Sequence, residues 1–425
     1  MIVRKKGRKT TAEYLFYISI IVSPLRCYGF VIGGMNFSFF RIAGVLMILA
    51  SLISKRKIIL NTQTKCITAI IFMTALQSLY SPYLSGAQSS FMSQFFGYIW
   101  ILFVCQIMSE SSDYSTANRM IVISAVIPLS LGLYQWVIYR TRGSIPSLPF
   151  QFMVSSEGKL GLTYNVYARI TSCFGDPAYM TTFYVGVFAV AFQQLMLSMN
   201  NNIERKEFRS IIIIILILII LETVMSISVS GIFGLIVCMG LLGLTNSYSI
   251  KKLGQFLLVL TVLIMGFSIY FIGKGSELID ILWFKMTTGT QTSSNLFGRN
   301  LYIKNALQVW SNHPIWGGGF GSLSLNGSFS SAHSSLLTVL GQQGIIVFIL
   351  NVVLLLFYPI RTFRSIRKAH LNEVRDSFLA PFLGLISVLA LTLGYDTLYS
   401  LDFCYVLIAI VSSYGWCINR EHSQN

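Results

Sequence analysis

The sequence contains few charged side chains for its length. Of its 425 residues, 11% are charged and 54% are hydrophobic. Charged residues make up about 25% of a typical soluble domain, and a large soluble core needs helices with polar outer faces. The composition therefore excludes an ordinary soluble globular protein.

The sequence also lacks the motifs of several enzyme classes. It has no Gly-x-x-x-x-Gly-Lys-Ser/Thr loop, so no phosphate-loop nucleotide site is expected. It has no His-Glu-x-x-His and no His, Cys and carboxylate cluster at metal-ligand spacing, which predicts no metal site. Without an Asp-x-Asp, a metal-dependent nucleotide-sugar enzyme is disfavoured. The seven cysteines, of which only Cys173 lies deep in a polar loop, give no disulfide framework.

Long apolar runs recur along the whole chain instead. They are 17 to 25 residues long, the length that an α-helix needs to cross a bilayer. The pattern predicts an all-α, polytopic integral membrane protein with a single membrane domain over residues 1–425. About twelve spans are expected, at residues 14–32, 37–54, 66–82, 91–109, 120–139, 178–199, 210–227, 228–245, 254–272, 334–358, 377–395 and 401–417.

The basic residues predict how these spans are oriented. The stretch Arg4–Lys9 is strongly basic, and no small-residue cleavage site follows the next apolar run, so we interpret it as a cytoplasmic flank and not a signal peptide. With both termini in the cytoplasm, 21 of the 31 Lys and Arg lie on the inner side, as the positive-inside rule expects. Two long periplasmic loops then fall at about 140–177 and 273–333. The net charge of +16 reflects this orientation, so we expect no nucleic-acid partner.

The most informative stretch runs from Arg299 to Gly344. Residues 296–311 have the pattern of a short amphipathic helix, which Pro314 and a cluster of glycines end in a tight turn. Ser330 or Ser331 is then expected to cap a new helix, which places His333 in its first turn. The positive end of a helix favours an anion and a neutral imidazole. A neutral His beside a bound anion is a candidate general base.

Other charged residues have simpler interpretations. Lys304 lies five residues after Arg299, which is about 140° around a helix, so it is assigned to the lipid headgroups. His313 directly precedes a proline and is interpreted as a turn residue. Asp176 and Pro177 suit the N-cap and the first position of the next span.

Three carboxylates lie in or near predicted spans. Glu222 follows an almost pure isoleucine and leucine run, so it is a functional candidate by default; the alternative is that it lies near enough to the outer boundary to be hydrated. Asp396 and Asp402 flank the last outer turn and are interpreted as ordinary loop charges.

The ordered set of motifs resembles the O-antigen ligase/polymerase superfamily. Arg299 is followed by Trp310, by His313-Pro314, by Gly317 to Gly321, and by Ala332-His333 with Gly344. This order and spacing match the family over about 45 residues. One departure is Ser334, because Asn commonly follows the His in that family.

The first long loop resembles the same family. Arg169 precedes a Phe-Gly-Asp-Pro step that ends at Pro177, as in the family's Phe-Gly-x-Pro pattern before a span. Without the resemblance, Arg169 would be interpreted as a solvated loop charge with no specific function; the resemblance favours a functional role. The step from Ser228 to Gly231 lacks the Arg of the family's Ser-Arg-Gly turn.

The resemblance implies glycosyl transfer from undecaprenyl-diphosphate-linked oligosaccharide repeat units at the periplasmic face of the bacterial inner membrane. Arg299 and Arg169 would hold the diphosphate, because the guanidinium fork suits phosphate oxygens. His333 would take the proton from the attacking sugar hydroxyl, and Gly318 and Gly319 would bind substrate. Neither a cofactor nor a metal ion is required if guanidinium groups neutralise the departing charge.

Three functions are compatible with this resemblance. A polymerase, which joins repeat units to one another, is the first expectation. A ligase, which moves the finished chain onto lipid A-core, is the alternative. A flippase ranks third, because such folds often have internal repeats and broken helices at the midplane, and the conspicuous polar features here lie in outer loops. The lipid bilayer is an expected partner, and a partner protein that regulates chain length is left open.

Overall fold

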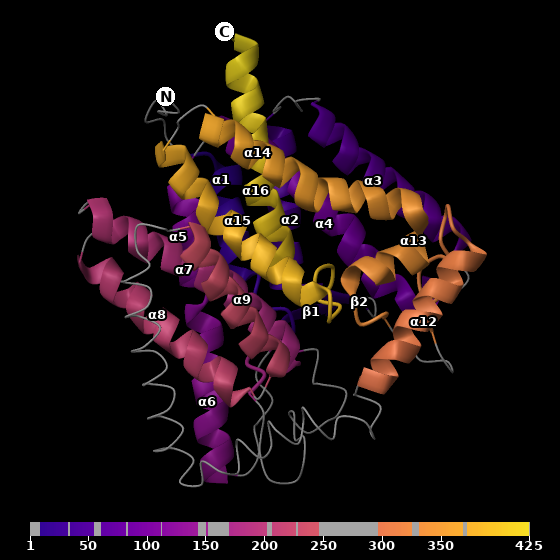
Figure 1. Ribbon diagram of the computed structural model, residues 1–425, viewed down its shortest axis with the longest axis horizontal. Helices are drawn as coiled ribbons and strands as arrows, with labels where there is room; N and C mark the ends of the chain where they lie inside the picture. The colour runs from indigo at the N-terminus through magenta and orange to yellow at the C-terminus, as the bar shows by residue number, and fades with distance from the viewer. Residues whose placement is uncertain are drawn as a thin grey trace.

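The computed structural model describes most of the chain as a bundle of helices (Figure 1). The described residues are 9–32, 35–54, 61–81, 84–111, 113–142, 150–151, 170–201, 206–226, 228–245, 296–324, 331–368 and 372–424. The helices in these ranges are α1 (Thr11–Val22), α2 (Phe39–Ile53), α3 (Thr62–Tyr80), α4 (Leu84–Ser111), α5 (Tyr114–Ser124), α6 (Val126–Arg142), α7 (Pro177–Asn201), α8 (Lys206–Met225), α9 (Val229–Thr245), α12 (Leu296–Asn312), α13 (Ser335–Val352), a π-helical turn (Val353–Phe357), α14 (Tyr358–Lys368), α15 (Asn372–Thr392) and α16 (Asp402–Gln424).

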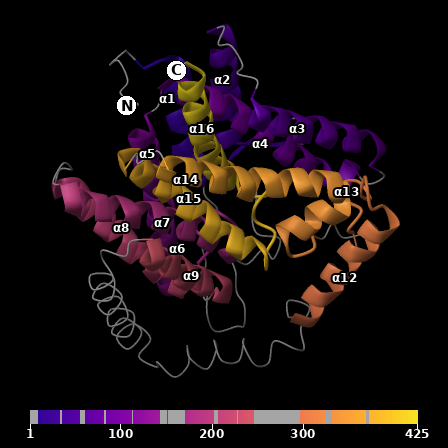
Figure 2. The same ribbon diagram turned by 45° about the horizontal axis from the view of Figure 1, so that its top comes forward.

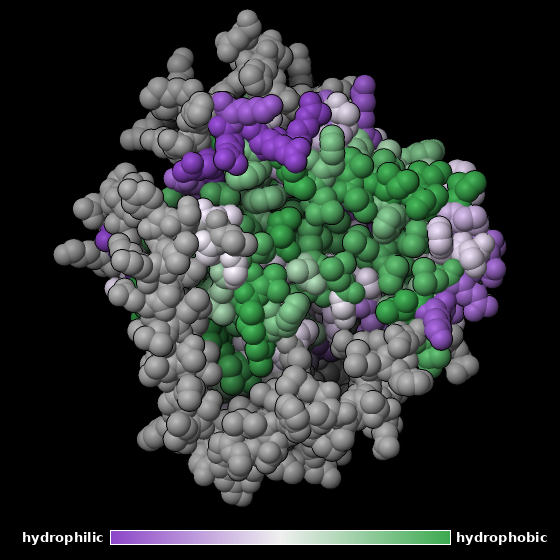
Figure 3. Space-filling view, in the orientation of Figure 1, coloured by the Kyte–Doolittle hydropathy of each residue, from purple (hydrophilic) through white to green (hydrophobic). Residues whose placement is uncertain are grey.

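Six helical segments are long and apolar enough to cross a membrane. They are Ser90–Ser111, Tyr114–Ile138, Pro177–Ser198, Phe208–Met225, Ser335–Lys368 and Val374–Thr392. Four shorter apolar helices accompany them, and the surface shows a broad apolar band with hydrophilic side chains over α14 at one rim and over the end of α12 at another (Figure 3). The structure is therefore mostly helical and consistent with a helical membrane protein, while the number of twelve spans stays a prediction.

The first predicted span, residues 14–32, is wrong in its second half. Helix α1 ends at Val22, and the chain then turns and enters a two-stranded antiparallel hairpin of β1 (Gly29–Ile32) and β2 (Met35–Ser38). Pro24 in this turn has no backbone N–H to continue a helix. The predicted span 254–272 lies outside the described residues. The other ten predicted spans each overlap a helix.

Two helix pairs form the centre of the bundle. Helix α7 packs along α15, and α4 packs along α16. Inward-facing aromatic residues fill the space between them, and the Phe183 and Phe403 rings meet edge to face with centroids 4.6 Å apart. Polar side chains also cross this core, because the Tyr399 hydroxyl donates to Asn351 Oδ1 over 2.8 Å. Such buried hydrogen bonds fix how the helices are aligned along one another.

The two ends of the bundle can be distinguished by their contacts. At one end, Lys9 forms a 2.9 Å salt bridge with Asp113 at the start of α5. The neighbouring Tyr114 ring stacks on Tyr414 of α16 at a centroid distance of 3.6 Å. The beginning of α1 and the C-terminal part of α16 therefore lie at the same end. The turn that follows α1 lies at the opposite end.

Helix α13 is broken in its middle, and the glycine-rich turn fills the break. Gly344 has φ 76° and ψ −178°, and Figures 1 and 2 show the two parts of α13 meeting at a sharp angle. The carbonyls exposed by the break accept hydrogen bonds from the turn, because the amides of Gly318 and Gly319 donate to the carbonyls of Gly341 and Gln342, both over 2.9 Å. In the opposite direction, the amide of Ile345, just after the break, donates a hydrogen bond to the Pro314 carbonyl.

A Gly344→Ala substitution should destabilise the fold strongly. The backbone of Gly344 is in a region that residues with a Cβ rarely occupy, and a Cβ here would lie 2.2 Å from the Ile315 carbonyl oxygen. We expect a loss of about 2 kcal/mol or more in the free energy of unfolding, measured as earlier thermal unfolding in detergent. Gly240→Ala is the matched control, because Gly240 lies in α9 with open space around it. It should be neutral or stabilising by about 1 kcal/mol, and equal unfolding of both variants would contradict this account of the break.

Candidate functional site

His333 lies just before α13 and not in its first turn. The helix begins at Ser335 with Ser334 as N-cap, and the Ser334 side chain makes no capping hydrogen bond. The predicted cap at Ser330 or Ser331 is therefore wrong, and so is the predicted place of His333. The reason is the backbone of His333, which is left-handed with φ 51° and turns the chain before the helix starts. Such a conformation is uncommon for a residue with a Cβ and often marks a functional position.

Two tyrosines from distant parts of the chain contact the His333 ring. The Tyr302 ring of α12 meets it edge to face at a centroid distance of 4.7 Å. The Tyr395 ring, from the loop between α15 and α16, lies 5.9 Å away. The imidazole is half-buried between them. The geometry therefore holds the imidazole in place while leaving part of it accessible.

The turn that carries His333 is fixed by Thr338 and Asp396. The Thr338 hydroxyl accepts from the Ala332 amide and donates to Asp396 Oδ2, both over 3.1 Å. A second link joins Ser335 to the same loop, because its hydroxyl accepts from the Leu398 amide over 3.0 Å. Burial raises the pKa of the Asp396 carboxyl, and hydrogen bonds and the charge of Arg26 oppose this shift. Asp396 consequently stays protonated to a higher pH than an exposed carboxyl.

Arg26 brings a cation to the same group of loops. It lies in the turn after α1, and its guanidinium carbon is 3.6 Å from the centre of the Tyr179 ring. The Tyr179 hydroxyl donates to the Asp396 carbonyl over 3.3 Å. The guanidinium also interacts electrostatically with Asp396 and Asp402. A stacked, charge-compensated guanidinium of this kind is held more rigidly than a surface arginine.

Asp402 is buried, so its interpretation as an ordinary loop charge is wrong. Its side chain is 6% exposed and accepts a 3.1 Å hydrogen bond from the Ser38 hydroxyl at the start of α2. Arg41, one turn further along α2, interacts with it electrostatically. The interpretation of Asp396 is also wrong, because this half-buried carboxylate accepts a hydrogen bond from Thr338 and so links its loop to α13. Buried carboxylates need such partners because desolvation is costly.

Asp176 caps α7 as predicted. Its Oδ1 accepts from the Ala178 amide over 2.6 Å, and α7 begins at Pro177. Its other carboxylate oxygen accepts from the Tyr395 hydroxyl over 3.0 Å. The cap therefore has a second role, because it joins the loop before α7 to the tyrosine that contacts His333.

The structure describes three of the four predicted substrate-binding residues, namely Arg299, Gly318 and Gly319. Arg299 lies in α12, one turn before Tyr302, whose ring contacts His333. Arg169 lies outside the described residues. The amides of Gly318 and Gly319 donate to α13 carbonyls, so these glycines support the break in that helix. That they bind substrate stays a prediction.

Glu222 is fully buried, so the prediction that it is hydrated near the outer boundary is wrong. The Tyr184 hydroxyl donates to its Oε2 over 2.5 Å. Gly132 of α6 packs directly against the carboxylate, and a Cβ there would lie 2.1 Å from the same oxygen. Glu222 therefore joins α6, α7 and α8 through packing and a hydrogen bond.

The residues that surround the His333 turn form what we call the His333 cluster. Sequence reasoning missed several of its members, among them Arg26, Tyr179, Tyr395, Asp396 and Asp402. One signal for Arg26 was available. Of the ten basic residues assigned to the outer side, only Arg26 and Arg41 lie outside the two long loops. Both are found beside Asp402.

Comparison with models of known protein families and with curated proteins finds no match to this chain. The family resemblance therefore depends on the motif residues alone. Within the described part of the chain, no three His, Cys, Asp or Glu side chains gather closely enough to hold a metal ion. All seven cysteines are buried, and none forms a disulfide bond.

Proposed function

We propose that the protein is an O-antigen polymerase, which joins undecaprenyl-diphosphate-linked repeat units at the periplasmic face of the bacterial inner membrane. The observation that carries the proposal is the cluster around His333. Four segments far apart in the sequence meet there: the turn after α1, the loop before α7, the turn before α13 and the loop before α16. Helix α12, which carries Arg299, contributes Tyr302 to the same cluster.

This reaction needs a base for the attacking hydroxyl and cations for the departing diphosphate. A sugar hydroxyl of one unit attacks the anomeric carbon of another, and the bond from that carbon to the diphosphate breaks. His333 takes the hydroxyl proton. Arg299 and Arg169 neutralise the charge that develops on the departing diphosphate, a role for which the guanidinium fork suits phosphate oxygens in two-pronged contact.

Arg26 has a supporting role in this proposal. Its guanidinium is half-buried, stacks on Tyr179 and interacts electrostatically with Asp396 and Asp402, so it is less suited to gripping a diphosphate than an exposed arginine. It instead holds Tyr179 and the Asp396 loop against the turn after α1. Because Asp396 fixes the His333 turn through Thr338, Arg26 is a positioning residue for the base.

Substitution of Arg26 should therefore reduce synthesis without abolishing it. We expect Arg26→Gln to lower long-chain formation about tenfold, the cost of one lost charged contact, and Arg26→Lys to restore most of it. Arg119→Gln is the matched control, because Arg119 also lies over an aromatic ring, that of Phe208 at 5.6 Å, but in α5. Lipopolysaccharide gels measure the chains. Chains of normal length and amount from Arg26→Gln would show that Arg26 does not position the base.

The lipopolysaccharide of a deletion strain tests the proposed function itself. A polymerase deletion should leave a single repeat unit on the core. A bare core with lipid-linked polymer retained would instead identify the alternative, a ligase that transfers the finished chain to lipid A-core. Loss of all exported repeats would identify a flippase and overturn a transferase assignment.

A further inference from the structure

The outer face of the long helix that follows Gly344 changes abruptly from apolar to basic. Ile349 is 52% exposed and Phe357 is 55% exposed, and Ile360 is also exposed at 38%. Arg361 and Arg364 follow immediately and are exposed as well. In a membrane helix, such a boundary marks the level at which the acyl chains end and the lipid headgroups begin.

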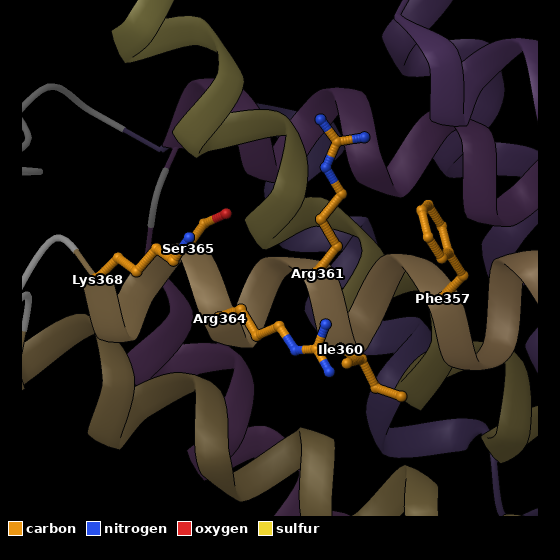
Figure 4. Close-up of a pocket in the computed structure, with 6 residues that line it drawn as sticks. All are labelled: Phe357, Ile360, Arg361, Arg364, Ser365 and Lys368. Atoms are coloured by element: carbon orange, nitrogen blue, oxygen red, sulfur yellow. The ribbon is translucent and has the colours of Figure 1, made fainter.

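The residues at this boundary form a pocket on one face of the helix. Phe357, Ile360, Arg361, Arg364, Ser365 and Lys368 line it. Their spacing of three and four residues places them on neighbouring turns of the same face. Figure 4 shows the Arg361 and Arg364 side chains extending in different directions from the helix, with Ile360 beside the Arg364 guanidinium. The pocket runs from the apolar Phe357 at one end to the basic Lys368 at the other.

The cations of this pocket form no salt bridge with another residue that the structure describes. Within the part of the chain that the structure describes, the salt bridges join Lys9 to Asp113 and Arg375 to Asp376, and none involves Arg361, Arg364 or Lys368. A ligand with one anionic group and an apolar tail would match both ends of the pocket. Two guanidinium groups and an ammonium suit the oxygens of a phosphodiester, and the exposed ring and aliphatic side chain suit an acyl chain.

We propose that this α14 pocket binds an acidic phospholipid, with the phosphodiester headgroup on Arg361, Arg364 and Lys368 and an acyl chain on Phe357 and Ile360. The binding site is separate from the His333 cluster and does not depend on the proposed transferase activity. A free phosphate would bind the same cations but would make no contact with Phe357 and Ile360 at the apolar end of the pocket. The two sources are therefore distinguishable.

The test is native mass spectrometry of the full-length protein in neutral detergent, titrated with phosphatidylglycerol or phosphatidylcholine. The wild-type protein should prefer phosphatidylglycerol. The double variant Arg361→Gln/Arg364→Gln should lose about 30-fold in affinity for it, from the contribution of two basic residues beside an acidic headgroup. Arg367→Gln is the matched control, because Arg367 is exposed on the same helix but does not line the pocket. It should retain the preference.

Three outcomes would overturn the proposal. Equal binding of the two lipids by the wild-type protein would show that the cations recognise no acidic headgroup. An equal loss in Arg367→Gln and in the double variant would indicate a diffuse positive surface and not a site. Displacement of phosphatidylglycerol by inorganic phosphate, together with unchanged lipid binding in Phe357→Ser, would identify a site for a free anion.

Discussion

Arg299→Lys should nearly abolish long chains while leaving the protein in the membrane. Lysine keeps the positive charge but is a single point charge, so it cannot make the two parallel hydrogen bonds of a guanidinium to a diphosphate. Loss of one well-placed donor to the transition state costs about 100-fold or more in rate. Arg169→Lys should have the same effect for the same reason. A silver-stained lipopolysaccharide gel beside a blot for protein level measures both quantities.

Lys304→Ala is the control for Arg299→Lys. Lys304 lies in the same helix and is exposed, so its loss should leave the ladder of chain lengths unchanged. If Arg299→Lys also gave a normal ladder at normal protein level, the arginine would only solvate the outer loop, and the proposed role in holding the diphosphate would fail.

The sequence predicts helices well where an apolar run ends at residues with strong local preferences. Asp176 and Pro177 are such residues, and α7 begins there as expected. The expected short helix within the second long loop is also found, as α12. The first span was predicted too long because average hydropathy remains high across Pro24 and Arg26, although the proline ends the helix. Local backbone chemistry decides such boundaries, and hydropathy does not record it.

The break in α13 shows a different reason for failure. A glycine inside an apolar run is compatible with a continuous helix, so Gly344 gives no local sign of a break. The break becomes stable because the glycine-rich turn supplies amides to the exposed carbonyls. These partners lie more than twenty residues earlier in the chain, so only the folded structure reveals them.

The site follows the same division between local and distant information. The family motif points to His333 and to the helix that carries Arg299. The residues that fix the histidine, Thr338 and Asp396, belong to other segments and have no motif of their own. Asp396 and Asp402 resemble ordinary loop charges in the sequence because burial depends on which loops meet. The sequence therefore points to candidate site residues but does not reveal the contacts that support them.

The largest effect of all should come from His333, through loss of the general base. His333→Ala should reduce long chains by at least about 100-fold, since a positioned acid–base group typically contributes that much. Alanine alone is an imperfect test, because residue 333 has φ 51° and an alanine there is strained. His333→Asn is the sharper variant, because asparagine adopts the left-handed conformation more readily and cannot act as a base. Both variants should lose the ladder at normal protein level. His313→Ala should keep it, because His313 is exposed beyond the end of α12. Normal chains from His333→Asn would mean that residue 333 serves only to turn the backbone, and the base would then have to be sought elsewhere in the cluster, first at Asp396.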